Sequence, residues 1–371
     1  DTAGSVSRGA AGGLMALAAA TGPHQLVVQT SFLGDTVLTT PLIAELATRG
    51  PVSVIVTPAS APLLARNPDI HELIVYDKWG ADSGLRGFRR LAQRVRAPEV
   101  PAGAPPAIAY LAQRSARSGA LALAAGYTQR VGFDGSAGQR LYTARVQYRE
   151  DRHHAERLLR LAFSGEAERD VDGEIAARDE SIHPKLFPGE AERAAVDALL
   201  GANDDSRPLV ALAPGSVWAT KRWPGYAELA NRLSSRYRLA IIGGRSDSSE
   251  AASIAEFSGA QGVVDGTASL TLLASAELIG RAKLLVTNDS APQHLASAMG
   301  TPTITIFGPT VEAFGFGPLA HDSISLGLDA LACRPCHHHG PPRCPLGHWR
   351  CMRELGVDAV AIAVDEVLSG C

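Results

Sequence analysis

Residues 284–307 read LLVTNDSAPQHLASAMGTPTITIF, and this stretch predicts the fold of the chain. Its two apolar runs, 284–287 and 303–307, are typical of buried strands, while residues 291–299 follow a helical pattern. A strand, a helix and a strand in succession favour parallel strands joined by a right-handed crossover. The stretch therefore predicts one βαβ unit.

The same alternation extends in both directions along the chain. Predicted strands cover residues 25–29, 52–56, 72–76, 107–111, 131–133, 209–213 and 239–242. Predicted helices lie between them, over residues 36–48, 118–125, 153–163, 191–200, 226–235, 248–257 and 270–279. We therefore expect an α/β protein with doubly wound sheets, whose ligands bind outside the carboxyl ends of the strands.

The length of the chain and a break in this pattern predict two domains. A chain of 371 residues exceeds the size at which one hydrophobic core usually stops growing. Charges and prolines interrupt the alternation between Gly165 and Pro208. We expect a flexible leader over residues 1–24, an N-terminal domain over 25–185 and a C-terminal domain over 186–371.

The charge balance argues against nucleic acid as a ligand. The formal net charge is -3 and the isoelectric point is near 6.4, whereas nucleic-acid binding normally requires a basic excess. The basic residues between Arg86 and Arg96 form a local cationic stretch. This stretch either faces anionic lipid or a phosphorylated acceptor, or is a solvated helix face.

Membrane and compartment signals are weak. No apolar run reaches the roughly 20 residues needed to span a bilayer, so we expect no transmembrane segment. Four of the five cysteines lie between residues 333 and 351, which is unlike the spread of a secreted disulfide framework. We expect a cytoplasmic protein, at most peripheral at the inner face of the inner membrane.

The loop after the first predicted strand contains a candidate catalytic carboxylate. Residues 30–41 read TSFLGDTVLTTP. Gly34 would let the backbone turn tightly, and Asp35 falls at the N-terminus of the next helix. There Asp35 either caps the helix or points its carboxylate at a ligand.

Two later loops are suited to a diphosphate. Residues 213–224, APGSVWATKRWP, combine a glycine, hydroxyls, two cations and exposed amides after a strand. In residues 286–294, VTNDSAPQH, Ser290 and the amides that begin the next helix can hold a phosphate. Asp289 either contacts sugar hydroxyls or caps that helix, and His294 either touches phosphate or only braces the loop.

In their order, these motifs resemble glycosyltransferase family 9, the heptosyltransferases of lipopolysaccharide core assembly. The resemblance rests on the Gly-Asp pair, on the sequence PGS followed by TKRWP, and on NDS-x-P-x-H followed by the peptides Gly-Thr-Pro and Phe-Gly-Pro-Thr. It spans about Leu26 to Val364. The cysteine segment 333–351 is similar to that of the heptosyltransferase II group. One departure is Ala291, where the family usually has glycine, so the donor sugar stays open.

The resemblance implies the GT-B architecture, in which two Rossmann-like domains face each other across a cleft. The N-terminal domain would bind the acceptor and the C-terminal domain the nucleotide sugar. The implied reaction moves a heptose from ADP-heptose, with inversion, to the heptosylated inner core of lipopolysaccharide. The acceptor would be lipid A–core at the membrane surface.

The resemblance also implies roles for single residues. Asp35 matches the proposed base, and Gly34, Thr36 and Arg117 lie on the acceptor side. Lys221 would both bind the donor and stabilise the charge on the leaving diphosphate. The implied donor-binding set is Ser216, Thr220, Lys221, Asp289, Ser290, Ala291 and His294. No metal is required for this chemistry.

The cysteines follow the spacing C-x2-C-x7-C-x6-C. Cys333, Cys336, Cys344 and Cys351 are enough to bind zinc or iron tetrahedrally, in a structural role. The alternative is a set of free or partly paired thiols.

Other functions fit the same pattern. The chain could transfer another nucleotide sugar to a protein or small-molecule acceptor, or act as a GT-B-type nucleotide-sugar epimerase. A nucleotide-sugar binder without activity is the remaining alternative. Only the transferase reading predicts that ADP release from ADP-heptose requires a heptosylated lipid acceptor.

Overall fold

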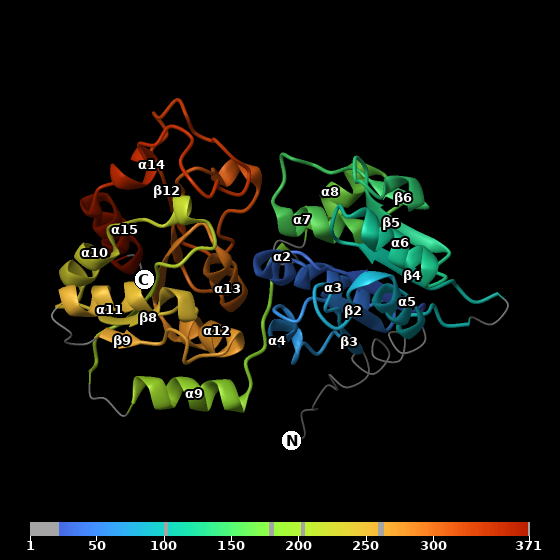
Figure 1. The fold of residues 1–371 in the computed structure, drawn as a ribbon, viewed down its shortest axis with the longest axis horizontal. Helices are drawn as coiled ribbons and strands as arrows, with labels where there is room; N and C mark the ends of the chain where they lie inside the picture. Colours follow the sequence, from blue (N-terminus) through green and yellow to red (C-terminus); the bar gives the residue numbers. More distant parts are fainter. Residues whose placement is uncertain (1–21, 100–102, 178–181, 202–204, 259–262, 370–371) are drawn as a thin grey trace, which may run out of the picture. The chain divides into compact units, whose positions relative to one another are not determined.

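The computed structural model describes residues 22–99, 103–177, 182–201, 205–258 and 263–369. The leader predicted over 1–24 lies almost wholly outside these residues. The chain divides into two compact units, the first comprising Asp1–Arg149 and Ala155–Ile182 and the second Glu150–His154 and His183–Cys371. Each unit is a layered α/β structure with helices on both sides of its sheet (Figure 1).

The first unit is built on a six-stranded sheet in the order β3-β2-β1-β4-β5-β6, with every pair parallel. Its strands are β1 (Gln25–Val28), β2 (Val52–Val56), β3 (Glu72–Val75), β4 (Ile108–Leu111), β5 (Gln129–Phe133) and β6 (Ala144–Val146). Its helices are α2 (Leu33–Leu38), α3 (Thr40–Ala47), α4 (Ala61–Leu64), α5 (Gly84–Arg94), α6 (Ala116–Ala124), α7 (His154–Leu159) and α8 (Glu168–Ala177), with short 3-10 turns at Gln139–Leu141 and Arg160–Phe163.

Both faces of this sheet are covered by helices. Leu91 of α5 and Leu121 of α6 share a buried cluster with Ile55 of β2. Successive side chains of a strand point to opposite faces, so the fully buried Val54 faces the other side, where α3 contacts β2. Burial on both faces explains why the central strands are apolar throughout.

The second unit repeats the design, with the parallel order β12-β11-β10-β7-β8-β9. Its strands are β7 (Leu209–Ala213), β8 (Arg238–Ile241), β9 (Val263–Asp265), β10 (Leu284–Asn288), β11 (Thr303–Ile306) and β12 (Ile324–Leu326). Its helices are α9 (Glu190–Leu200), α10 (Tyr226–Leu233), α11 (Ser248–Phe257), α12 (Leu272–Arg281), α13 (Ala291–Met299), α14 (Arg350–Arg353) and α15 (Val357–Ser369), with 3-10 turns at Ala219–Lys221, Arg245–Asp247 and Glu312–Phe314.

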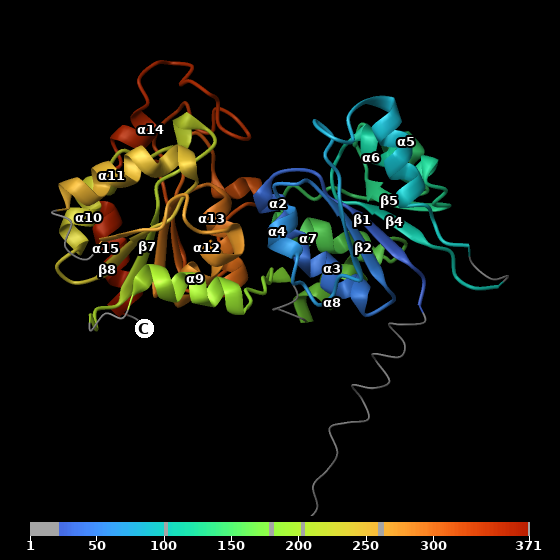
Figure 2. The same ribbon diagram turned by 60° about the horizontal axis from the view of Figure 1, so that its bottom comes forward.

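Two helical layers enclose the second sheet. Helices α10, α11 and α15 share the main buried cluster with Val210 and Val286 of the central strands. Helix α12 contacts α9 and α13 in the other layer. Figure 2 shows both layers from a second direction. The predicted α/β class with two doubly wound, Rossmann-like domains is confirmed.

The strand order reverses at one point in each sheet, and this point locates the sites. Reading outward from β1, the chain first adds β2 and β3 on one side and then β4, β5 and β6 on the other. In the second sheet the chain starts at β7, adds β8 and β9 on one side, and then adds β10, β11 and β12 on the other. Loops that leave the carboxyl ends of the strands flanking such a switch point diverge, and ligands bind in the gap between them.

Several elements differ from the predictions. The single helix predicted over 36–48 is two helices, α2 and α3, because Pro41 has no N–H to donate and the helical bonding is interrupted at Thr39. The segment after Gly165 was interpreted as an interruption, but it contains α8. The short strands β6, β9 and β12 and the helices α5 and α15 were not predicted as elements of the fold.

A short excursion of the chain was also not predicted. Residues 150–154 belong to the second unit, although the first unit continues after them. The backbone N–H of His154 donates to the carbonyl of Gly315 at 2.7 Å, and the His153 ring nitrogen Nε2 lies 3.0 Å from the carbonyl oxygen of Gly317. The chain therefore enters the second unit twice. Within the described part of the chain, no helix has the length and apolar character needed to cross a bilayer.

Candidate functional site

Asp35 lies in the first turn of α2, just beyond the carboxyl end of β1. Its Oδ2 accepts a hydrogen bond from the Ser31 hydroxyl at 2.6 Å and one from the Phe32 backbone N–H at 3.2 Å. The side chain of Asp35 is half-buried. The carboxylate therefore caps α2 by accepting the Phe32 N–H, and its hydrogen bond to Ser31 fixes its orientation.

Gly34 does not have the role that was predicted for it. It is buried as the second residue of α2, and it is not among the glycines with positive φ. The expectation of a tight glycine turn was therefore wrong, because the helix starts at Leu33, before Gly34 rather than after it. Thr36 is buried in the same helix and donates to the Phe32 carbonyl at 3.2 Å.

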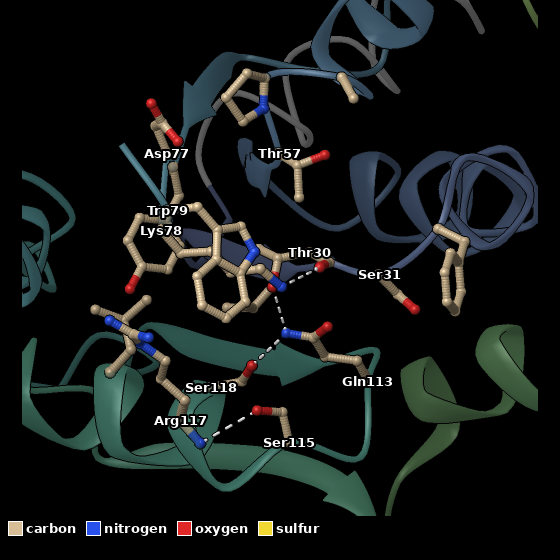
Figure 3. A pocket seen from close by; sticks show the side chains of 16 residues that line it. Thr30, Ser31, Thr57, Asp77, Lys78, Trp79, Gln113, Ser115, Arg117 and Ser118 are labelled. Atoms are coloured by element: carbon tan, nitrogen blue, oxygen red, sulfur yellow. Dashed lines mark hydrogen bonds between the residues drawn. The ribbon is translucent and has the colours of Figure 1, made fainter. Parts of the chain in front are cut away.

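A cavity of about 590 Å³ opens at the carboxyl ends of β1 to β4 (Figure 3). Ser31 and Phe32 line it from the loop after β1, and Arg117 lines it from the start of α6. The remaining lining comes mainly from the ends of β2 and β3 and from the loop after β4. The cavity therefore occupies the switch point of the first sheet, as the fold predicts.

The polar groups of this cavity are fixed by hydrogen bonds. The Gln113 amide nitrogen donates to the Thr30 hydroxyl at 2.7 Å and to the Ser118 hydroxyl at 2.6 Å. Lys78 Nζ donates to the Thr30 carbonyl at 3.1 Å. These bonds join the loops after β1, β3 and β4 into one wall.

Cations and aromatic rings alternate around the cavity. The Arg117 guanidinium lies 5.4 Å from the Tyr76 ring centre, and Lys78 Nζ lies 5.8 Å from that of Trp79. Burial raises the pKa of the Tyr76 phenol, and the nearby Arg117 opposes that rise. Two cations beside two rings suit a sugar that bears an anionic group.

Sequence reasoning found Arg117 but missed Lys78, Trp79 and Gln113. Lys78 and Trp79 follow directly on the strand predicted over 72–76, and Gln113 follows the one over 107–111. The signal that could have identified them was polar or aromatic residues at the carboxyl ends of predicted parallel strands.

In the second unit, Lys221 and Asp289 form a buried ion pair. Lys221 Nζ lies 2.6 Å from Asp289 Oδ2, and their side chains are only 9% and 11% exposed. The Thr310 hydroxyl donates to the same Oδ2 at 2.6 Å. The loops after β7, β10 and β11 therefore meet at one carboxylate, and the ammonium of Lys221 has a defined position.

The loop after β7 is tied to its neighbours by further polar contacts. Arg222 donates to the Ser216 carbonyl at 3.0 Å and to the Asp247 carboxylate at 3.0 Å. A Cβ added at Gly215 would lie 2.6 Å from the Asp247 carboxylate, so a larger residue there requires Asp247 or the loop to shift. The Ser290 hydroxyl donates to the Gly215 carbonyl at 3.3 Å.

Helix α13 begins at Ala291, where the sequence predicts a phosphate-binding helix end. Ser290 is the residue before the helix, and its side chain does not cap it. Ala291 is half-buried at the first helical position, and the buried His294 ring lies 6.4 Å from that of Phe316, edge to face. Pro292 has no N–H, and the Gln293 N–H donates to the Ser290 carbonyl at 3.2 Å, so the amide of this first turn that can bind an anion is that of Ala291.

The hydroxyls of Ser216 and Thr220 take part in local structure. Ser216 Oγ accepts the Trp218 N–H at 3.3 Å, and Thr220 Oγ1 donates to the Pro341 carbonyl at 2.5 Å. All seven predicted donor-side residues lie on the loops that leave β7 and β10 or on the first turn of α13.

The cysteine segment packs directly on this loop. Trp349 Nε1 donates to the Thr220 carbonyl at 3.3 Å, and a Cβ at Gly340 would lie 3.1 Å from Lys221 Cε. Arg334 donates to the carbonyls of Phe307 at 3.0 Å and Gly308 at 2.6 Å. Residues 333–351 thus support the loop that positions Lys221.

The four thiols of this segment are free and near one another. Burial raises the pKa of the Cys351 thiol to about 11, and the other three thiols add to the rise. Cys333 Sγ lies 4.0 Å from His348 Nε2. Among the described residues, no three or more His, Cys, Asp or Glu side chains are arranged to hold a metal ion.

Two Rossmann-like units, each with polar loops at its switch point, define the GT-B class of glycosyltransferases. The model of glycosyltransferase family 9 (heptosyltransferase) matches residues 106–346, and the chain belongs to this family. Lipopolysaccharide heptosyltransferase 2 of Salmonella typhimurium is 29% identical over 312 residues, which cover 80% of this chain and 85% of that protein.

Solved structures show the same fold. A glycosyltransferase of family 9 from Veillonella parvula superposes with a TM-score of 0.78 at 22% identity, covering 94% of this chain and 98% of that one. ADP-heptose lps heptosyltransferase II of E. coli gives a TM-score of 0.71 at 22% identity, covering 94% and 99%. The predicted family, glycosyltransferase activity and likeness to heptosyltransferase II are confirmed, and the epimerase alternative is not favoured.

Proposed function

We propose that this glycosyltransferase moves a heptose from ADP-heptose to the heptosylated inner core of lipopolysaccharide. The observation that supports it most directly is the buried Lys221–Asp289 pair beside the first turn of α13. This arrangement offers a fixed cation and the Ala291 backbone amide to a diphosphate. Similarity to heptosyltransferase 2 proteins supports heptose and lipopolysaccharide as the substrates.

The second unit would bind the donor. Lys221 and the amide that begins α13 would contact the diphosphate and stabilise the charge that develops when it leaves. Asp289 orients Lys221 and would contact donor hydroxyls. Ser216, Thr220 and Ser290 would complete the loop around the phosphates, Ala291 would contribute its backbone amide, and His294 would brace the helix.

The first unit would bind the acceptor and supply the base. An acceptor hydroxyl oxygen attacks the anomeric carbon as the bond from that carbon to the diphosphate oxygen breaks, so ADP leaves with the bonding electrons. Asp35 accepts the hydroxyl proton as the new bond makes that hydroxyl acidic. An ordinary carboxylate is ionised at neutral pH and can do this.

The cavity beside Asp35 would take the acceptor saccharide. Arg117 and Lys78 supply positive charge, and the aromatic rings supply apolar surface for a sugar face. Gly34 and Thr36 do not line the cavity; they are buried in α2 on either side of Asp35 and would hold its backbone in place. Since lipid A–core is anchored in a bilayer, the protein would work at the inner face of the inner membrane.

Donor turnover tests this function. ADP release from ADP-heptose is measured with heptosylated lipid A–core, with lipid A–core lacking heptose, and with no acceptor. We expect release only with the heptosylated acceptor, together with a product heavier by one heptose. Release that ignores the acceptor, or that occurs only with another nucleotide sugar, contradicts the proposal.

For the cysteine segment we propose one structural zinc or iron ion held by Cys333, Cys336, Cys344 and Cys351. The ligand types and the spacing C-x2-C-x7-C-x6-C support it, and the described thiols would have to move closer to coordinate one ion. Metal analysis should give one equivalent per chain, and Cys336→Ser should reduce it and lower the melting temperature. Much less than one equivalent of both metals in the unmodified protein contradicts the proposal.

A further inference from the structure

Helix α5 presents a cationic surface for which the transfer reaction has no use. The α5 surface consists of Leu85, Arg86, Arg89, Arg90 and Arg94, all of them exposed. The helix contains four arginines and no acidic residue, although the whole chain has a formal net charge of -3. The surface is therefore a local concentration of positive charge.

Helical periodicity separates this surface from the core. Leu91 and Ala92 are buried in the cluster that joins α5 to the sheet, and Phe88 packs against the same cluster. Leu85 lies three residues before Phe88 and four before Arg89, so it projects at the boundary between the buried side and the arginine side, where it is exposed. The exposed side thus combines an apolar residue with arginines.

The arginines nearest the solvent are not neutralised within the unit. Arg90 lies 3.5 Å from Asp82, and Arg94 donates to the Val75 carbonyl at 2.6 Å. Arg86 and Arg89 have no ion-pair partner in the part of the chain that the structure describes. Asp82 therefore pairs with one arginine of the surface, and the charges of Arg86 and Arg89 are left for a ligand.

Exposed apolar side chains accompany the charge. Leu85 is 65% exposed and Trp79, in the turn before the helix, is 86% exposed. Cationic helices with exposed Trp or Leu are typical of segments that lie in the headgroup region of a bilayer. A surface that binds only soluble anions has no need of these apolar groups.

The turn before α5 connects this surface to the cavity. Lys78 and Trp79 line the cavity, and a Cβ at Gly87 would lie 2.2 Å from the Asp82 carbonyl carbon, so the turn packs tightly on α5. Figure 2 shows α5 next to α6, whose first residues also line the cavity. The α5 surface is therefore beside the proposed acceptor site.

We propose that the α5 surface binds the anionic headgroups of a phospholipid bilayer and holds the acceptor cavity at the membrane. Arg86 and Arg89 would contact lipid phosphates, while Leu85 and Trp79 would enter the interface. The benefit of this membrane binding rests on the proposed function, because the acceptor in that reaction is anchored in a bilayer. The binding itself needs neither donor nor acceptor.

The test is flotation of the full chain with vesicles, without donor or acceptor. Vesicles of phosphatidylcholine alone are compared with vesicles containing equal parts of phosphatidylcholine and phosphatidylglycerol. We expect binding only to the anionic vesicles and its loss at high salt. Arg86→Ser with Arg89→Ser should weaken it on the order of 25-fold, about fivefold for each charge. Leu85→Ser should weaken it severalfold.

The matched control is Arg232→Ser with Arg236→Ser, which removes two exposed arginines of the second unit that pair with Asp358 and Asp365. It should leave vesicle binding unchanged. Equal binding by both double variants overturns the proposal. The proposal is also overturned if the Arg86→Ser, Arg89→Ser double variant no longer transfers the sugar to a delipidated acceptor, because the surface would then bind the saccharide of the acceptor. If transfer fails in the unmodified protein while flotation succeeds, only the proposed function fails.

Discussion

At the scale of single residues, the capping role of Asp35 does not conflict with its proposed role as the base. Its Oδ2 accepts hydrogen bonds from the Ser31 hydroxyl and the Phe32 backbone N–H. The carboxylate therefore caps the start of α2 and is held in one orientation. A cap needs only an acceptor atom, whereas a base must also bind a proton. Asparagine can supply the first function but not the second.

We therefore predict that Asp35→Asn keeps ADP affinity and the melting temperature but lowers kcat by at least about 10²-fold, the usual contribution of a positioned base. Asp134→Asn is the control, because its carboxylate accepts the Tyr148 N–H in the same unit but does not line the cavity. Steady-state kinetics and calorimetry with ADP check this. Similar kcat values for the two variants would rule out Asp35 as the base.

The structural role of Lys221 in the buried ion pair can be separated from its proposed role in binding the diphosphate. Lys221→Met leaves the Asp289 carboxylate buried without its partner, which costs roughly 3–5 kcal/mol of stability. Adding Asp289→Leu removes that charge and should restore most of the stability. We predict that ADP binding and transfer stay weak in the double variant, because the diphosphate still lacks its cation.

Urea denaturation measures the free energy of unfolding of both variants, and calorimetry measures their affinity for ADP. Recovery of ADP binding and transfer along with stability would mean that Lys221 only supports the fold.

At the scale of elements, the loop after β7 packs Gly215 closely against the Asp247 side chain. In Gly215→Ala the new methyl would collide with Asp247, the carboxylate that also pairs with Arg222. We predict a loss of about 1–3 kcal/mol in stability and weaker ADP binding, because the loop must shift.

Gly173→Ala is the matched control for that substitution. Gly173 is exposed within α8, and nothing lies within 4 Å of a Cβ built there. The exchange should stabilise the protein by about 0.5–1 kcal/mol and leave ADP binding unchanged. A Gly215→Ala variant that behaves like Gly173→Ala would show that the loop tolerates the displacement.

At the scale of the whole molecule, the proposed reaction divides its charges between the units. Asp35 belongs to the first unit, and Lys221 and the Ala291 amide belong to the second. Because Lys221 and this amide supply the positive charge for the diphosphate, we predict that EDTA in the assay leaves kcat unchanged within about twofold.

The metal content of the cysteine segment should be measured in the same sample, so that loss of a structural ion is not mistaken for loss of a catalytic one. Inactivation that added magnesium reverses would mean that a divalent metal takes part in the reaction.

Local pattern was enough for much of the fold. The predicted strands over 52–56 and 209–213 and the predicted helices over 248–257 and 291–299 have the bounds seen in the structure. These segments are strongly apolar or strongly periodic. By contrast, β9 and β12 are three-residue strands without a fully buried residue, so their pattern is too short and too weak to predict.

The sequence by itself determined the class of fold, the family and the loops that hold the polar residues, because periodicity and motif order are local properties of the chain. Only the tertiary structure decided which of those residues meet. Lys221 and Asp289 are 68 residues apart, and Thr30 and Gln113 are 83 apart. Such contacts exist because parallel pairing brings the carboxyl ends of distant strands to one edge, and spacing along the chain carries no record of that.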